Sequence, residues 1–324
     1  MKKDFNQKIN EHLNKFAISV QQEEDLIGWK VVTVEDEQEQ RFFAILKQND
    51  LFKNINLVTT KYQQGEALGL VQIMAGTTDT DREERIPKRA TIAGEYHCQQ
   101  MNIDGFIPYA KLDSYTADPL FDETVERFLN THLLQSILMI GWHGKERKGT
   151  SNPAENPMGE DVQKGWLQKI RDNATAKNKD NVLNIGEIGE NGTYSTLNKA
   201  IKAGISKISP VYRDGDLIAI CGRGIVGNSP IENNKEGLNG QFITRLQNLV
   251  GGCKAVMLPH FPDNAILLTR LDNLSFYVHR NNIRRGWLDA PERDALEHLF
   301  SFNVDFVVED FDGCALLENI ELNE

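Results

Sequence analysis

The chain has 324 residues, 40% hydrophobic and 26% charged, which suffices for one large domain or two smaller ones. No apolar run approaches the roughly 18 residues of a membrane-spanning helix, and polar residues interrupt the N-terminus where a signal peptide would be continuously apolar, so membrane insertion and secretion are not expected. The formal net charge of −11 at pH 7 argues against sequence-reading contact with DNA or RNA, because an acidic surface releases few counterions from phosphates.

The first 27 residues predict an amphipathic helix followed by a polar joint. Apolar residues recur there at spacings of four, four, three and four, which places on one helical face Phe5, Ile9, Leu13, Phe16 and Val20. Two polar stretches follow, Gln21–Asp25 and Glu35–Gln40. Such a helix is expected to be a docking element or a removable segment, or else to pack on its own domain.

Residues 51–111 predict a long two-stranded arm with a charged tip. Leu51–Thr60 and Glu66–Met74 are strand-like, and Glu95–Lys111 is a returning run of alternating apolar and polar residues. Because an isolated ribbon is marginally stable in water, the arm is expected to lie on a neighbouring molecule. The tip carries Asp79, Asp81, Arg82, Glu83, Glu84 and Arg85. We expect solvated or intersubunit ion pairs there, because acid–base catalysis needs two carboxyls in a shielded cleft.

The clearest predicted helix begins at Asp118–Pro119, because Asp is a favoured N-cap and Pro suits the first helical position. It is expected to end near His143 and to be roughly 40 Å long, at about 1.5 Å per residue. The stripe that should be buried consists of Phe121, Val125, Phe128, Leu129, Leu133 and Ile137. After this helix we expect a loop over Gly149–Gly159, a short helix over Val162–Arg171 and a polar stretch over Asp172–Gly192.

The second half of the chain predicts an α+β block from about Tyr194 and then a final sheet. The block should contain a helix over Thr196–Ile208, a strand over Asp216–Cys221 and a helix over Phe242–Val250. Two hairpins are predicted in the last third, the second because Asp-Gly at 312–313 is a strong turn signal. Their strands are Ala265–Leu271 with Leu274–His279, and Phe302–Asp310 with Cys314–Leu322. Extensive predicted sheet without a pattern of catalytic residues favours a structural role over an enzymatic one.

No pattern of catalytic, cofactor-binding or metal-ligating residues stands out. Gly222–Gly227 matches the GxGxxG spacing of dinucleotide sites, but Asn228–Ser229–Pro230 follows rather than a helix, so a glycine-rich turn is favoured. The seven histidines show no metal-ligand spacing, and the four cysteines form no CxxC pair, which indicates free thiols in a reducing cytoplasm. We therefore expect no catalytic residues, no cofactor and no metal.

One cluster of basic and aromatic residues, His279–Trp287, contains Arg284 and Arg285. Nucleic-acid contact is one interpretation of such a cluster. In a chain with a net charge of −11, guanidinium groups bonded to the carboxylates of a neighbouring subunit are the favoured alternative.

Five sequence blocks, in order from about residue 30 to the C-terminus, resemble the major capsid proteins of Peduovirus-type (P-two-like) tailed bacteriophages. The blocks are TTDT (77–80), IPKRAT (86–91), Asn156–Ala174, Phe261–Arg285 and FNVDFVVEDFDGCALLENI (302–320). Each block alone is weak, and their order makes the resemblance specific. It implies the α+β Hong Kong 97-type capsid fold, with an N-terminal arm, an extended E-loop ribbon, a peripheral domain containing a long spine helix, and an inserted axial domain.

The resemblance also implies domain boundaries and a processing site. The domains would be 1–50 for the N-terminal segment and arm, 51–113 for the E-loop ribbon, 114–193 for the peripheral domain with its spine helix at 119–143, 194–259 for the axial domain, and 260–324 for the returning peripheral strands. Relatives are trimmed by a phage protease during maturation. By position, the matching joint is near Val32 and Thr33, which would remove about residues 1–32.

The implied function is that of a major capsid protein, not an enzyme, which self-assembles into the hexamers and pentamers of an icosahedral shell. That shell would enclose double-stranded DNA without sequence-specific binding. The implied partners are further copies of the chain, a scaffold or protease, and portal and head-completion proteins. The implied location is the virion, after assembly in the bacterial host cytoplasm. Two alternatives stay open, namely an encapsulin-like nanocompartment shell of the same fold, and a nucleotide-binding enzyme that uses Gly222–Gly227.

Overall fold

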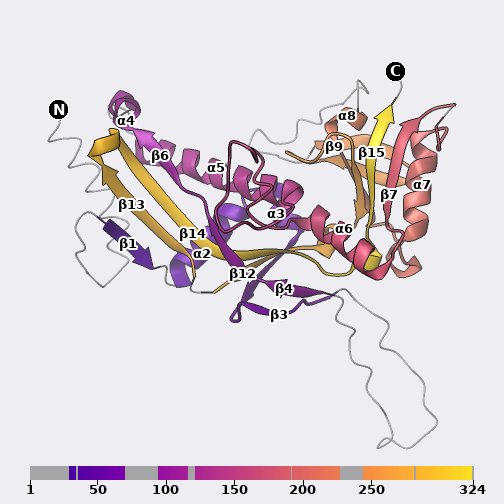
Figure 1. Cartoon of the computed structure of the whole chain (residues 1–324), viewed down its shortest axis with the longest axis horizontal. Helices are drawn as coiled ribbons and strands as arrows, with labels where there is room; N and C mark the ends of the chain where they lie inside the picture. The colour runs from indigo at the N-terminus through magenta and orange to yellow at the C-terminus, as the bar shows by residue number, and fades with distance from the viewer. Residues whose placement is uncertain are drawn as a thin grey trace, which may run out of the picture.

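The computed structural model shows an elongated molecule with a large β-sheet towards each end (Figure 1). The residues that the structure describes are 29–33, 36–69, 94–115, 121–190, 192–226, 244–280 and 282–322. The predicted N-terminal helix and the charged tip of the arm lie outside these residues. None of the helices in these ranges is long and apolar enough to cross a membrane.

A seven-stranded sheet is built around β14 (Ala295–Val308). This strand forms antiparallel pairs with β5 (Gln99–Asn102), β6 (Gly105–Pro108), β12 (Leu274–His279) and β13 (Arg284–Ala290). At the two edges of the sheet lie β1 (Trp29–Thr33), next to β13, and β2 (Asn56–Thr60), next to β12. Alternate residues of β14 are buried from position 296 to 304, which is the pattern of a strand that packs a core on one face.

Helices pack on this sheet. They are α2 (Asp36–Leu46), α3 (Asp50–Asn54), α4 (Tyr109–Tyr115), α5 (Phe121–His143) and α6 (Trp166–Lys177). The long helix α5 confirms the predicted spine over the described part of its range. Where it approaches α6, the buried Trp166 ring lies 4.8 Å from Trp142 and 4.9 Å from Phe306, centroid to centroid. Gly141 permits this approach, because a Cβ there would lie 2.6 Å from the Trp166 ring.

The predicted buried stripe of the spine helix is confirmed at four positions, and the side chain of Phe121 lies outside the described residues. Leu133 and Ile137 are buried, and Val125 and Leu129 are partly buried. Phe128, however, is 42% exposed, because it lines a cavity beside the helix instead of packing against the sheet.

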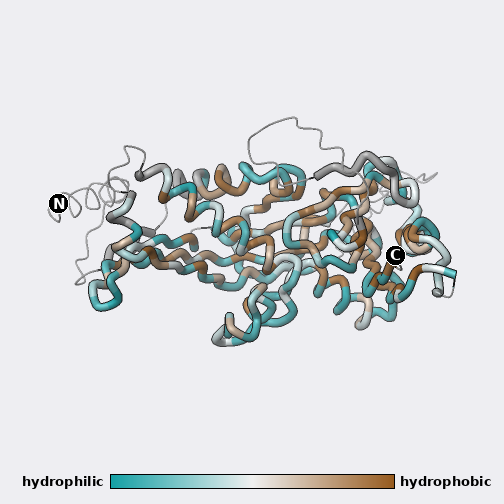
Figure 2. Tube along the Cα trace, turned by 90° about the horizontal axis from the view of Figure 1, so that it is seen from above, coloured by the Kyte–Doolittle hydropathy of each residue, from teal (hydrophilic) through white to brown (hydrophobic). Residues whose placement is uncertain are grey.

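A six-stranded sheet stands at the other end of the molecule (Figure 1), in the order β7–β15–β11–β8–β10–β9. Its strands are β7 (Val182–Ile188), β8 (Ile218–Cys221), β9 (Thr244–Val250), β10 (Cys253–Met257), β11 (Ile266–Thr269) and β15 (Ala315–Leu322). The predicted helix α7 (Leu197–Lys207) is confirmed and packs on this sheet, where a Cβ at Gly204 would lie 2.7 Å from Leu317. In Figure 2, apolar segments run through the interior of the molecule and polar segments along its margins.

Both predicted hairpins in the last third are wrong, although all four strands exist. β11 pairs with β8 and β15, whereas β12 pairs with β14 and β2, so the chain crosses from one sheet to the other at η3 (Leu271–Asn273). It crosses back between β14 and β15 at η5 (Phe311–Gly313). β11 and β12 are buried on both faces and can take inner places in different sheets, so a local turn signal does not decide their partners. The six-stranded sheet therefore includes strands from outside the expected axial range 194–259.

Several local predictions also differ from the structure. Residues 51–54 are helical, because the Asn49 side chain caps α3 by accepting a hydrogen bond from Leu51 N (2.8 Å). The short helix expected from Val162 begins at Trp166, and β7 lies within the polar stretch Asp172–Gly192, where no strand was predicted. The segment expected to be a helix over Phe242–Val250 contains β9, whose pairing with β10 supplies partners that local propensity does not reveal.

The returning run of the predicted arm is divided between two sheets. β5 and β6 belong to the seven-stranded sheet, and residues 109–111 belong to α4. Among the described residues, the ribbon consists of β3 (Gln64–Glu66) and β4 (Glu95–His97), which project from the body in Figure 1.

Candidate assembly surfaces

The two crossings between the sheets lie side by side and are bonded to each other. The buried Asn273 side chain donates a hydrogen bond to Asp310 O (2.9 Å) and accepts one from Asp310 N (2.8 Å). Its Nδ2 also donates to Thr269 Oγ1 (3.2 Å). One amide therefore links the β11–β12 crossing to the β14–β15 crossing, at the junction of the two sheets.

Other elements hold the same junction. The Tyr212 hydroxyl donates to Asp310 Oδ2 (2.7 Å), and burial, reinforced by this carboxylate, raises the pKa of Tyr212. Asn181 Nδ2 donates to Phe311 O (3.0 Å). The position of one sheet relative to the other thus depends on polar side chains from η2 (Pro210–Tyr212) and from the residue before β7.

The ribbon is attached to the body through a buried carboxylate at the end of β14. Glu309 accepts hydrogen bonds from Gly69 N (2.7 Å) and from the Tyr277 hydroxyl (3.0 Å). That hydroxyl in turn accepts from Leu68 N (2.9 Å), and the Tyr277 ring stacks on Tyr96 of β4 at 4.8 Å. Burial is the main cause that raises the pKa of Tyr277. The chain leaving β3 is therefore fixed where it departs from the body.

A second buried carboxylate fixes the other strand of the ribbon. Asp305, which is 3% exposed, accepts a hydrogen bond from His97 N (2.8 Å) and pairs with Lys169 Nζ of α6 (2.7 Å). At the end of β4, His97 is exposed, and the next residue, Cys98, is buried. Both strands of the ribbon are thus held by carboxylates, β4 by Asp305 of β14 and the chain after β3 by Glu309, which directly follows β14. The six charged residues predicted at its tip, 79, 81, 82, 83, 84 and 85, lie outside the described residues.

The predicted processing joint and the predicted arginine pair lie opposite each other. In the antiparallel β1–β13 pair, Val32 is opposite Arg285 and Thr33 is opposite Arg284. Because β1 is at an edge of the sheet, one side of its backbone has no strand partner among the described residues. The Val32–Thr33 bond therefore lies in an extended edge strand rather than in a loop.

The two arginines have different surroundings. Arg284 is exposed, whereas the side chain of Arg285 is 17% exposed and faces its own chain. Arg285 Nε donates to His298 Nε2 (2.8 Å), and its Nη1 lies 3.7 Å from Glu126 Oε1 on α5. Burial lowers the pKa of Arg285, and Glu126 opposes that shift. Arg285 thus helps to hold the spine helix on the sheet, and Arg284 is the better placed of the two for contact with another subunit.

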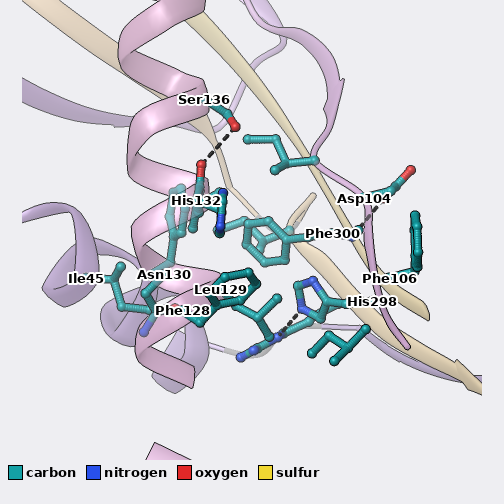
Figure 3. A pocket seen from close by; sticks show the side chains of 17 residues that line it. Ile45, Asp104, Phe106, Phe128, Leu129, Asn130, His132, Ser136, His298 and Phe300 are labelled. Atoms are coloured by element: carbon teal, nitrogen blue, oxygen red, sulfur yellow. Dashed lines mark hydrogen bonds between the residues drawn. The ribbon is translucent and has the colours of Figure 1, made fainter. Parts of the chain in front are cut away.

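A cavity of about 320 Å³ lies beside the spine helix (Figure 3). Figure 3 shows Phe128 and His132 of α5 on one side and His298 and Phe300 of β14 on the other, with Phe106 near the edge. The sequence did not reveal this cavity, because Phe128 reads as one more member of the apolar stripe. One of the two predicted contact arginines, Arg285, is part of its lining.

The glycine motif has a packing explanation. A Cβ at Gly222 would lie 2.2 Å from the carbonyl oxygens of Pro262 and Asp263, so only glycine fits there. A short helix, α8 (Arg223–Val226), does follow directly, contrary to the sequence-based expectation, but it has one turn. Gly227 lies outside the described residues. Close backbone packing therefore accounts for Gly222 without a ligand.

Metal-binding and thiol chemistry find no support in the part of the chain that the structure describes. No group of three or more His, Cys, Asp or Glu residues there could hold a metal ion. All four cysteines are free and buried, and burial raises the pKa of Cys221 to about 12, which leaves the thiol protonated and unreactive.

The polar residues at the junction and at the ribbon base were missed by the sequence analysis. Asn273, Asp305 and Glu309 each interrupt or end a strongly apolar run, and a polar residue in such a place is often a buried hydrogen-bonding group. That signal could have identified these three residues as buried hydrogen-bonding groups. It could not have identified their partners, which are distant in the sequence.

Comparison with known proteins agrees with this architecture. Residues 6–320 match the model of the family described as "Phage major capsid protein, P2 family". The chain is 32% identical to the capsid proteins of Escherichia phage P2, over 91% of this chain and 88% of that protein. It is 29% identical to the major capsid protein of Serratia phage KSP20, over 87% of each.

A solved structure gives the same result. A chain of the satellite phage P4 procapsid, determined with the size determination (Sid) protein, aligns with a TM-score of 0.76 and 31% identity. The alignment covers 88% of this chain and 99% of that one, which confirms the expected α+β Hong Kong 97-type capsid fold. With the sheets, the spine helix and the projecting ribbon in place, the sequence and structural relatives lead to one conclusion: the chain belongs to the P2 family of phage major capsid proteins.

Proposed function

We propose that this major capsid protein assembles into hexamers and pentamers, which close into an icosahedral shell around the double-stranded DNA of a tailed phage. The observation that carries the proposal is the ribbon, which projects from the body and is held at its base by Glu309 and Asp305. A projecting ribbon is marginal alone and gains stability on a neighbouring subunit.

The elongated shape, with one sheet towards each end, supports a different set of contacts in the shell for each sheet. The six-stranded sheet would surround the centre of each capsomer as the axial domain, and the seven-stranded sheet with α5 would lie between capsomers as the peripheral domain. Permanent interfaces of this kind bury on the order of 2,000 Å² or more. A net charge of −11 would limit adhesion to the packaged DNA.

Processing between Val32 and Thr33 is part of the proposal. The joint lies in an edge strand, and an extended strand with one free side is a suitable shape for a protease cleft once β1 has separated from β13. Mature particles should then contain a chain that begins near Thr33, and an intact Met1 in purified DNA-filled heads would contradict this. The proposed partners are a scaffold or protease, the portal and head-completion proteins, with assembly in the bacterial cytoplasm before the shell becomes part of the virion.

The two alternatives receive less support. The sequence relatives are phage capsid proteins, which favours a phage shell over an encapsulin-like compartment. The packing explanation for Gly222 removes the main reason to expect a nucleotide-binding enzyme.

Assembly can be tested at the ribbon with the full-length chain. Leu68 is 70% exposed, and we propose that it is covered by a neighbouring subunit. Leu68→Asp should therefore abolish the shells or capsomer tubes seen by negative-stain electron microscopy while the chain remains folded. Gln63→Asp places the same charge at another exposed position beside β3 and should assemble like the parent. Normal shells from Leu68→Asp would contradict the proposed role of the ribbon.

A further inference from the structure

The cavity beside α5 is open to solvent and has aromatic residues at its edge. Phe106 is 68% exposed and Phe128 is 42% exposed. The lining between them is largely apolar and includes Leu129, Leu133 and Phe300. Large apolar side chains gathered around an open cavity mark a surface that another apolar group covers.

Several of the polar groups that line the cavity have partners within the chain. The Asp104 carboxylate accepts a hydrogen bond from Phe300 N (3.0 Å), and His298 Nε2 accepts one from Arg285 Nε (2.8 Å). The Ser136 hydroxyl donates to His132 O (2.8 Å) within α5. Because these groups are satisfied within the chain, the cavity suits an apolar side chain better than a polar ligand.

The chain has an apolar segment that is long enough and near enough to reach this cavity. Residues 1–28 precede β1 and lie outside the described residues. β1 pairs with β13, and the cavity is lined by Arg285 of β13 and by Ile283, just before that strand. Trp29 is opposite Leu288, three residues from Arg285, which corresponds to about 10 Å along the strand. Residues 21–28 can span roughly 26 Å when extended, so the helix predicted from the sequence of residues 5–20 can reach the cavity.

We propose that residues 5–20 bind to this cavity of their own chain as an amphipathic helix. Their apolar stripe has the spacing of a helix that inserts side chains into a groove. The volume of 320 Å³ is about twice that of a cavity of roughly 150 Å³ that holds benzene, so it accepts a pair of neighbouring stripe residues such as Leu13 and Phe16. Residues 1–20 also carry four lysines against two acidic residues, and long-range attraction to the rest of this acidic chain favours the docking.

The docking itself does not depend on capsid assembly. If processing near Thr33 also occurs, it would remove the occupant and expose Phe106 and Phe128 in the mature chain. That consequence rests on the proposed function, whereas the docking can be measured in the unprocessed chain alone.

Disulfide trapping in the full-length chain tests the proposal. The four native cysteines are buried, so two introduced cysteines can be followed without interference. Phe106 is exposed, and its replacement should not disturb folding. The double variant Leu13→Cys with Phe106→Cys should form an intrachain disulfide at least ten times faster than Asn14→Cys with Phe106→Cys, because Asn14 lies away from the apolar stripe. Denaturing gels without reductant then separate a compact monomer from a covalent dimer.

Equal rates for the two pairs would overturn the proposal. So would a covalent dimer as the main product, because the cavity would then hold the segment of another copy. Hydrogen exchange provides a second measurement in the unprocessed chain. Leu13→Asp with Phe16→Asp should speed amide exchange in residues 103–107 several-fold, whereas Gln7→Asp with Asn14→Asp, on the polar face, should not. Unchanged exchange in the first variant would mean that something else, or nothing, covers the cavity.

Discussion

At the scale of single residues, buried polar side chains determine how the parts of this capsid protein are joined. Asn273 bonds the two sheet crossings to each other, and Glu309 and Asp305 hold the ribbon. Each accepts a hydrogen bond from a backbone N–H, and a backbone group that is buried and left unpaired costs about 1–3 kcal/mol. These residues, rather than a catalytic group, are therefore the ones whose replacement is most informative.

Replacing Asn273 should destabilise the junction. Asn273→Ala removes the partners of Asp310 N and Asp310 O while both stay buried, so the free energy of unfolding should fall by about 2–4 kcal/mol. Urea unfolding of the unassembled chain measures this change. Asn184→Ala, at an exposed position of β7, is the matched control and should change stability by less than about 1 kcal/mol. A loss at Asn273 no larger than the control would show that the amide is not important for the junction.

His298 should make the folded chain sensitive to acid. Burial, with the neighbouring Arg285 charge, lowers the pKa of His298 from its ordinary value near 6.5 to about 3. The unfolded chain takes up this proton below about pH 6.5, whereas the folded chain does so only near pH 3. The stability contributed by neutral His298 is therefore complete above pH 6.5 and is lost as the pH falls towards 3.

The effect can be isolated with a neutral substitute. Between pH 7 and pH 4.5, the free energy of unfolding of the parent should fall by about 2–3 kcal/mol more than that of His298→Gln. His132→Gln, at an exposed position of α5, should follow the parent. Urea titrations of the unassembled chains at both pH values provide the comparison. An equal fall in the free energy of unfolding in the parent and in His298→Gln would contradict a buried, neutral His298.

At the scale of elements, the ribbon depends on both strands being held at the base. Glu309→Gln replaces one acceptor oxygen by a donor, so either Gly69 N or the Tyr277 hydroxyl loses its acceptor. A loss of about 1–3 kcal/mol at this point should speed amide exchange at Gly69 about tenfold or more. Glu292→Gln, which is exposed in η4 (Pro291–Arg293), is the control. Exchange that stays at the parent rate would show that the ribbon is held by other contacts.

Elements governed by local signals were predicted well, and elements governed by distant partners were not. The spine helix and α7 follow from apolar periodicity, and β8 from a short apolar run, whereas the predicted start of the spine helix at Asp118–Pro119 lies outside the described residues. The predicted hairpins are wrong because β12 lies in a different sheet from β11, and β15 in a different sheet from β14. The segment of β9 was wrongly predicted to be helical because its pairing with β10 outweighs its own propensity. The cavity beside α5 needs five elements to form, so no single stretch of sequence could indicate it.

At the scale of the whole molecule, the elongated body with a sheet at each end and a ribbon at its side is a shape for making many contacts with copies of itself. The two sheets are joined by the two crossings, so the body has a defined junction between the part expected at the capsomer centre and the part expected between capsomers. The resemblance found in the sequence predicted this architecture, but the pairing of β11 and β15 with β8 and β7 required the structure.

A three-dimensional reconstruction of the particles formed by the purified chain shows whether the chain builds a closed capsid shell. We expect closed shells with five-fold and six-fold capsomers, in which the six-stranded sheets meet around each axis and each ribbon lies on a neighbouring subunit. Monomers or small uniform oligomers as the only species, or shells whose ribbons contact no neighbour, would contradict the account.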